Sequence, residues 1–147
     1  MSEWAKDLLP WAAPLLTLAG WFLVNKQNNA RESRKEARSA ADRCKILTRE
    51  SAQLGIKYWE AKPDATSWQV KALLEELEVE ICRFPEKKGR PDLLAKHIDL
   101  VEAIMGYDFD SARMQPKTPT DPVMRDIAKA RQRLLFEVEH QFEAHYQ

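Results

Sequence analysis

The hydrophobic pattern begins with an apolar run, "LLPWAAPLLTLAGWFLV", from Leu8 to Val24, which contains no charged residue. Apolar side chains would cover every side of a helix here, and so short a chain offers little body to bury them. The run is about 25 Å long as a helix, and counting from Trp4 brings it close to the roughly 30 Å hydrocarbon core of a bilayer. We therefore expect a single transmembrane helix. Its expected residues are Leu8, Pro10, Trp11, Pro14, Leu15, Leu18, Gly20, Trp21, Phe22 and Val24.

A cleaved signal peptide and a buried helix of a soluble protein are alternative interpretations of this run. A signal peptide begins with a basic region, but "MSEWAKD" carries Glu3 and Asp7 beside Lys6. "TLA" at 17–19 would serve as a cleavage site, yet the basic stretch that follows opposes export. A buried helix with no polar side needs a larger surrounding protein. The transmembrane interpretation is preferred to both.

The charges after the run predict its orientation. Residues 25–50 hold eight Lys/Arg against four Asp/Glu, whereas residues 51–147 hold fourteen against seventeen. Because basic residues concentrate on the cytoplasmic side of a span, the C-terminal part should be cytoplasmic at the inner membrane, with the N-terminus outside. The juxtamembrane basic residues are Lys26, Arg31, Arg34, Lys35 and Arg38. They are expected to attract anionic lipid headgroups. Nucleic acid is not an expected partner, since acidic residues interrupt the cations and no aromatic platform accompanies them.

Residues 25–60 contain no proline and a single glycine, Gly55, so the membrane helix should continue as a stalk. In a seven-residue repeat, small residues recur on one side, which permits close packing with another copy or with later helices of the chain. One repeat position holds Ala30, Ala37, Cys44, Ser51 and Tyr58, and the other holds Ser33, Ala40, Leu47 and Leu54. The candidate helix–helix face comprises Ala13, Thr17, Gly20, Ala30, Ala37 and Ala40.

Three further helices follow from apolar residues at three- and four-residue spacing. The first lies after "AKPDATS" and ends before Pro85, the second runs from Pro91 to a stop at Gly106, and the third begins at Asp121 and Pro122. Their expected inward residues are Val70, Leu73, Leu74, Leu77, Ile81 and Phe84; Leu93, Leu94, Ile98, Leu100, Val101, Ile104 and Met105; and Met124, Ile127, Leu134, Leu135, Val138 and Phe142. No strand is expected.

The predicted fold is therefore all-α. An N-terminal flank and single transmembrane helix (1–24) continues into a basic stalk (25–60), followed by a cytoplasmic bundle (61–147) of about four helices. The distal stalk, around 47–59, is counted among these four.

The segment "YDFDSA", residues 107–112, has the most suggestive chemistry. Two aspartates two residues apart are typical of a phosphotransferase loop or the start of a calcium loop. The first should follow a parallel strand, and the second needs a further oxygen ligand and a glycine in register, where Ala112 stands. We instead expect Asp108 and Asp110 to bond local backbone amides while Tyr107 and Phe109 pack on the bundle.

No other set of residues suggests a reaction. His97, His140 and His145 do not form a metal-ligand pattern, and Cys44 and Cys82 are interpreted as packing residues of a protein in a reducing compartment. The four glycines are scattered, so there is no phosphate-binding loop. We expect no catalytic residue, metal or cofactor. A basic run in the last helix (Arg125, Lys129, Arg131, Arg133) is either a solvated face or a contact for an acidic partner.

Two functional hypotheses follow. The first is a membrane-tethered, non-enzymatic interaction module that recruits a cytoplasmic protein or assembles with itself at the inner membrane face, with lipid as its other partner. In outline, the chain also resembles small membrane effectors of bacterial toxin or anti-phage defence systems. That resemblance implies a short span that multimerises into a pore.

Overall fold

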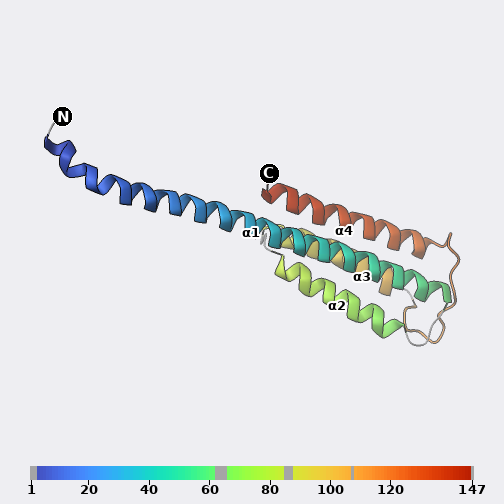
Figure 1. The fold of residues 1–147 in the computed structure, drawn as a ribbon. Coiled ribbons are helices and arrows are strands. Elements are labelled where there is room, and N and C mark those ends of the chain that lie inside the picture. Colours follow the sequence, from blue (N-terminus) through green and yellow to red (C-terminus); the bar gives the residue numbers. More distant parts are fainter. Residues whose placement is uncertain (1–2, 62–65, 85–87, 107, 147) are drawn as a thin grey trace. The chain divides into compact units, whose positions relative to one another are not determined.

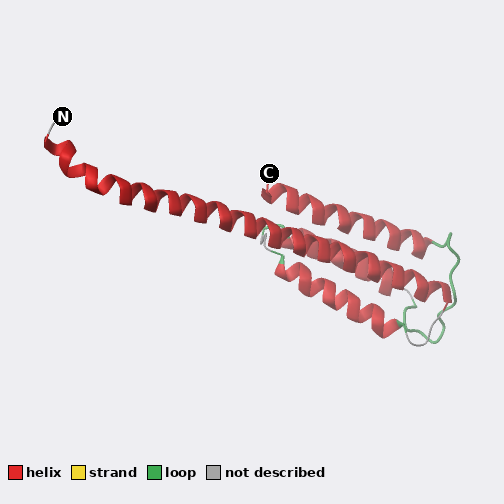
Figure 2. Cartoon of the chain, in the orientation of Figure 1, coloured by secondary structure: helices red, strands yellow, loops and turns green. Residues whose placement is uncertain are grey.

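The computed structural model describes residues 3–61, 66–84, 88–106 and 108–146, with side chains from Pro14 onward. It contains four α-helices: α1 (Glu3–Ala61), α2 (Ser67–Arg83), α3 (Arg90–Met105) and α4 (Pro122–Tyr146) (Figure 1). No strand occurs in these ranges (Figure 2). The predicted all-helical class and the helical bundle are confirmed.

The helix ends follow the expected punctuation. Pro91 lies in the first turn of α3, where a missing amide hydrogen costs no helical bond. Gly106 ends α3, with its backbone N–H donating to the Glu102 carbonyl at 2.9 Å. At α4, the Asp121 carboxylate accepts a hydrogen bond from the Val123 N–H at 3.0 Å, as an N-cap does. Local residue chemistry is therefore sufficient to place these boundaries.

The chain divides into two compact units, Met1–Glu36 and Ala37–Gln147, and α1 contributes to both. The second unit is the bundle. Ala37, Ala41 and Cys44 are each at most 1% exposed, so the part of α1 that packs in the bundle begins well before Leu47. The segment expected to be a stalk is thus a bundle helix from Ala37 onward.

Small residues on α1 set how closely the bundle helices pack. The buried positions of α1 are Ala37, Ala41, Cys44, Leu47, Thr48, Ser51, Ala52, Gly55, Tyr58 and Trp59. One predicted repeat position, which includes Ala37 and Tyr58, is buried as expected. At the other position Leu47 is buried and Leu54 packs against the core as expected, but Ala40 is only partly buried and Ser33 is exposed; Ala41, Thr48 and Gly55, one residue later, are buried as well.

The closest approach is at Gly55. A Cβ atom added there would lie 2.9 Å from Cγ2 and 3.1 Å from Cγ1 of Ile104 in α3. The buried hydroxyls beside it do not need partners from other helices, because Thr48 donates to the Cys44 carbonyl at 2.7 Å and Ser51 to the Leu47 carbonyl at 2.8 Å. The side chains on this side of α1 are therefore small and their polar groups are hydrogen-bonded, so neighbouring helices can approach closely.

Trp59 fastens the other end of the bundle. Its indole Nε1 donates to the Ile104 carbonyl at 2.9 Å, one of the carbonyls that the end of α3 leaves without a helical partner. The Trp59 carbonyl in turn accepts from the Lys117 N–H at 2.7 Å. One fully buried residue thus joins α1, α3 and the segment that leads to α4.

The inner face of α3 differs from the expected one. The buried residues of α3 are Leu93, His97, Leu100 and Ile104, whereas Ile98 is 54% exposed. His97 can occupy the interior because its Nε2 donates to the Leu74 carbonyl of α2 at 3.0 Å. The expectation that Ile98 faces inward is therefore wrong.

Within the bundle, α2 and α4 lie on opposite sides of α1 and α3 (Figure 1). Ion pairs link α1 to each of them: Arg43 pairs with Glu76 of α2, and Arg38 with Glu139 of α4. The solvent-facing sides of α2 and α4 therefore lie on opposite surfaces of the bundle (Figure 1).

We predict that Gly55→Ala lowers the thermal stability of the bundle. The new methyl group meets Ile104, and overpacking of about 1–3 kcal/mol should exceed the roughly 1 kcal/mol that alanine gains in helix propensity. Thermal unfolding followed by circular dichroism measures the change. Gly20→Ala is the matched control, since no atom lies within 4 Å of its added Cβ. A Gly55→Ala protein as stable as the parent would contradict the close approach of α1 and α3.

Candidate membrane-binding segment

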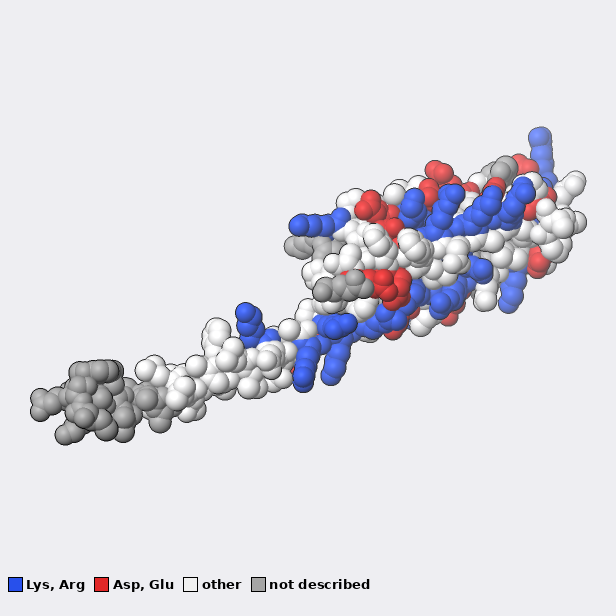
Figure 3. All heavy atoms as spheres, turned by 90° about the horizontal axis from the view of Figure 1, so that it is seen from above, with Lys and Arg blue, Asp and Glu red and all other residues white. Residues whose placement is uncertain are grey.

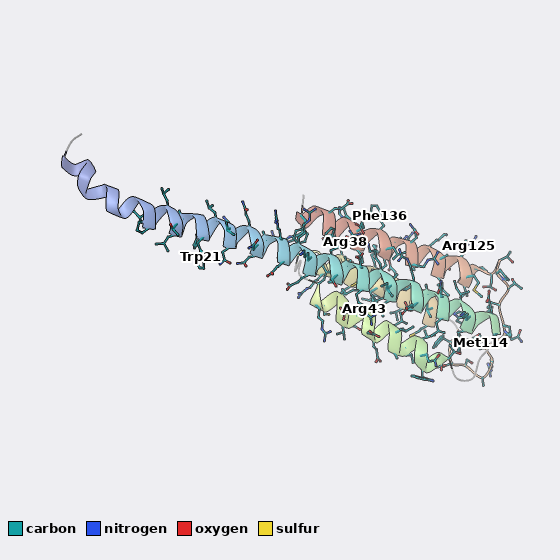
Figure 4. The ribbon with its side chains drawn as sticks, viewed as in Figure 1. Trp21, Arg38, Arg43, Met114, Arg125 and Phe136 are labelled. Atoms are coloured by element: carbon teal, nitrogen blue, oxygen red, sulfur yellow. The ribbon has the colours of Figure 1, made fainter. Side chains whose placement is uncertain are left out.

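A run of large apolar side chains is exposed on the first unit. The residues are Leu15, Leu16, Leu18, Trp21, Phe22, Leu23 and Val24, between 57% and 73% exposed. Successive helical residues are rotated by about 100°, so this run covers all sides of α1 rather than one stripe. Figure 4 shows Trp21 extending outward from the helix.

The described residues cover only part of the predicted span. Pro14, Gly20 and the seven large apolar residues are exposed, whereas the side chains of Leu8, Pro10, Trp11 and Ala13 lie outside the described residues. Among the residues that the structure describes, no helix combines the length and the apolarity needed to cross a membrane.

The basic residues after the apolar run are exposed as well: Lys26, Arg31, Arg34 and Lys35. At helical rise, Lys26 lies about 3 Å and Arg31 about 10 Å beyond Val24, while Lys35 lies about 17 Å beyond it. The Debye length at physiological ionic strength is about 8 Å. Lys26 therefore lies within one Debye length of Val24 and Arg31 just outside it, so these two cations are the nearest to the apolar run.

Arg38, the fifth expected juxtamembrane cation, belongs to the bundle. Its Nη1 lies 2.7 Å from Oε1 of Glu139, and its guanidinium lies 5.0 Å from the centre of the Phe142 ring. Lys45 Nζ reaches Oε2 of Glu139 at 2.6 Å. These two cations lower the pKa of Glu139, Lys45 more than Arg38. Arg38 is thus occupied within the bundle.

The candidate helix–helix face divides between the two units. Thr17, Gly20 and Ala30 are exposed, whereas Ala37 is buried and Ala40 packs against the core of the bundle. At Ala37 and Ala40 the small residues thus serve packing with later helices of the same chain. Ala13 lies outside the residues whose side chains are described.

Residues 108–112 pack on the C-terminal end of α1. The Phe109 ring lies 4.4 Å from the Tyr58 ring, and the Tyr58 hydroxyl accepts from the Asp110 N–H at 2.9 Å. The Asp110 carboxylate pairs with Lys71 of α2, and this contact lowers the pKa of Asp110. This contact joins the segment to α2, and Phe109 packs on the bundle as expected. Asp108 is exposed, and Tyr107 lies outside the described residues.

The described histidines and cysteines do not form a common site. No group of three His, Cys, Asp or Glu residues that could hold a metal ion occurs in the described ranges. Burial raises the pKa of the Cys44 thiol to about 12, which keeps it protonated, while Cys82 is exposed on α2. Burial likewise lowers the pKa of His97, so that this side chain is neutral in the core.

Two grooves flank α4 in the bundle. One, of about 540 Å³, lies against α1 and is lined by Lys45, Arg49, Gln53, Arg131, Gln132, Leu135, Phe136 and Glu139. The other, of about 390 Å³, lies against α3 and is lined by Asp99, Glu102, Ala103, Asp126, Lys129, Ala130 and Arg133. Figure 3 shows how the Lys and Arg side chains of the bundle gather along one face. Sequence reasoning identified the basic run of α4 but not the contribution of Arg49 from α1.

Buried neutral His97 predicts a loss of stability in weak acid. Its pKa is lower in the folded chain than the roughly 6.5 of an unfolded one, so below pH 6.5 the unfolded state binds the proton first. Stability should fall by up to about 1.4 kcal/mol per pH unit there. In His97→Gln, denaturant unfolding measured from pH 8 to pH 5 should lack this decline, with parallel profiles above pH 7. Equal slopes below pH 6.5 would contradict the prediction.

Comparison of the chain with family models, curated proteins and solved structures found no match.

Proposed function

We propose that the chain is a membrane-tethered, non-enzymatic helical interaction module. The exposed apolar run from Leu15 to Val24 carries the proposal. Burying a Leu, Phe or Val side chain contributes about 1.5–3 kcal/mol, so transfer of the whole run to an apolar environment would be worth on the order of 10 kcal/mol. Left in water, the run is an aggregation liability.

The distribution of the apolar side chains favours lipid over a protein partner. A helix that docks on a protein buries one stripe and keeps polar residues on its other side. Here Leu16, Trp21 and Val24 point in directions about 60–140° apart around the helix axis, and all are exposed. Lipid can cover every side at once. With residues 8–14 included, the run approaches the length of a single-pass span.

The neighbouring charges support an orientation with the bundle in the cytoplasm. Lys26 and Arg31 lie where anionic headgroups would be, each contributing about 1 kcal/mol near the surface. This electrostatic contribution is small beside the apolar one. We infer that the tether is mainly hydrophobic and that the cations orient it, with the N-terminus outside.

The bundle is proposed to bind a protein rather than to catalyse a reaction. Several of its charged side chains form ion pairs within the bundle: Glu139 pairs with Arg38 and Lys45, and Asp110 pairs with Lys71. The exposed surface instead combines charge with single apolar residues, of which Phe136 is the most exposed, at 67%. Mixed surfaces of this kind suit protein recognition.

The first test is flotation of the full chain with phospholipid vesicles. We expect it to float with the vesicles and to remain bound in 0.5 M NaCl, because salt screens the cations but not the apolar run. Leu18→Lys combined with Phe22→Lys should abolish flotation, since each Lys near the middle of a span costs about 2.5–3.5 kcal/mol.

Ile98→Lys is the matched control, because it places the same charge on an exposed apolar residue of the bundle and should leave flotation unchanged. Failure of the parent chain to float, or salt-induced release, would contradict the hydrophobic tether. The same vesicles loaded with dye test the pore hypothesis. An interaction module retains the dye, whereas a membrane-perturbing effector releases it.

The orientation is tested by protease digestion of intact cells that express the chain. Exposed Lys88 and Arg113, in the loops before α3 and before α4, offer trypsin cleavage sites. With the bundle in the cytoplasm, they should be protected until the membrane is permeabilised and cleaved afterwards. Cleavage in intact cells would reverse the proposed orientation.

A further inference from the structure

The groove between α1 and α4 holds an excess of positive charge. Of its cations, Lys45 is paired with Asp42 and Glu139. Arg49 of α1 and Arg131 of α4 pair with no carboxylate among the described residues, and the Nε atom of Arg131 is buried without a hydrogen-bond partner. Two guanidinium groups that face one groove repel each other. A carboxylate placed between them would relieve this repulsion.

The other α4 groove does not have this property. Lys129 and Arg133 line it together with three acidic residues, Asp99, Glu102 and Asp126. Its charges are therefore balanced within the chain, with a small acidic excess. The positive excess belongs to the α1–α4 groove, which is also lined by an exposed aromatic residue, Phe136. The groove thus fits an acidic helix that also carries apolar side chains.

The outer face of α2 has the complementary chemistry. Glu76 and Glu80 pair with Arg43 and Arg83, but Glu75 and Glu78 are exposed and form no ion pair among the described residues. Val79 and Trp68 are 47% and 63% exposed and point within about 40° of Glu75 around the helix axis, whereas Glu78 is turned about 80–100° from them toward α3 and lines a groove there with Glu75. This side of α2 therefore offers two carboxylates and two apolar anchors.

We propose that the α2 face of one copy of the chain docks in the α1–α4 groove of a second copy. Glu75 and Glu78 would meet Arg49 and Arg131, while the apolar α2 residues cover Leu135 and Phe136. The inference deepens the proposed interaction function by naming the partner as the chain itself.

Two arguments favour a second copy over another acidic protein. The unpaired charges of the two surfaces are opposite in sign and equal in number, and α2 and α4 lie on opposite sides of the bundle (Figure 1). A copy that uses one surface keeps the other free, so the contact is head-to-tail and can extend into a row or a ring. A shared membrane would hold the copies in one plane and raise their effective concentration.

A charge exchange in the full chain, solubilised in a mild detergent, tests the contact. Self-association is measured by sedimentation or by energy transfer between two labelled populations. Arg49→Glu alone and Glu78→Arg alone should each weaken self-association at least about tenfold, because each places like charges opposite each other. A mixture of the two variants should associate again, since every groove then faces an α2 helix of opposite charge.

Arg125→Glu is the matched control, because it reverses an exposed charge on α4 outside both grooves and should have no effect. Arg131→Gln provides a second groove variant, and circular dichroism verifies that each variant folds. A monomeric parent chain, association insensitive to both reversals, or no recovery in the mixture would each overturn the proposal. Vesicle flotation reports the tether independently, so failure of the tether and failure of the contact are distinguishable.

Discussion

The bundle depends on the close approach of α1 to the other helices. At Gly55 the α1 backbone lies so near Ile104 that a single methyl group would fall 2.9 Å from a side-chain carbon. Ala37, Ala41 and Ala52 have short side chains on the same buried side of α1. The hydroxyls of Thr48 and Ser51 donate hydrogen bonds to backbone carbonyls of α1 itself. Without these small residues, the helices would separate and the large core residues contributed by the other helices would lose their contacts.

Close packing also determines which ion pairs α1 forms. Arg38 and Lys45 pair with Glu139 of α4, and Arg43 pairs with Glu76 of α2, so α1 is linked by ion pairs to both helices. Such partly exposed pairs contribute modestly to stability. Their greater effect is to leave Arg49 and Arg131 without an acidic partner in the described chain, and this imbalance is the basis of the proposed contact between copies.

The two units are adapted to different surroundings. The bundle buries a core of large apolar residues and leaves only scattered ones such as Phe136 exposed, whereas the apolar residues of the first unit, such as Leu18 and Phe22, form a continuous exposed run. Helix α1 is continuous between them, from Glu3 to Ala61. A tether and an interaction module on one helix would combine membrane placement with protein contact, which is the function that we propose.

The sequence by itself determined the elements that depend on neighbouring residues. Proline, glycine and Asp121 placed the helix ends, periodic apolar residues gave the amphipathic helices, and the apolar run 8–24 stood out by composition. Tertiary structure decided the assignments that depend on distant residues. Periodicity could not place Arg38 against Glu139, which is 101 positions away, nor show that Arg49 and Arg131 share a groove. It also misplaced Ile98, because the His97 hydrogen bond to Leu74 that admits an imidazole to the core exists only after α2 and α3 have packed.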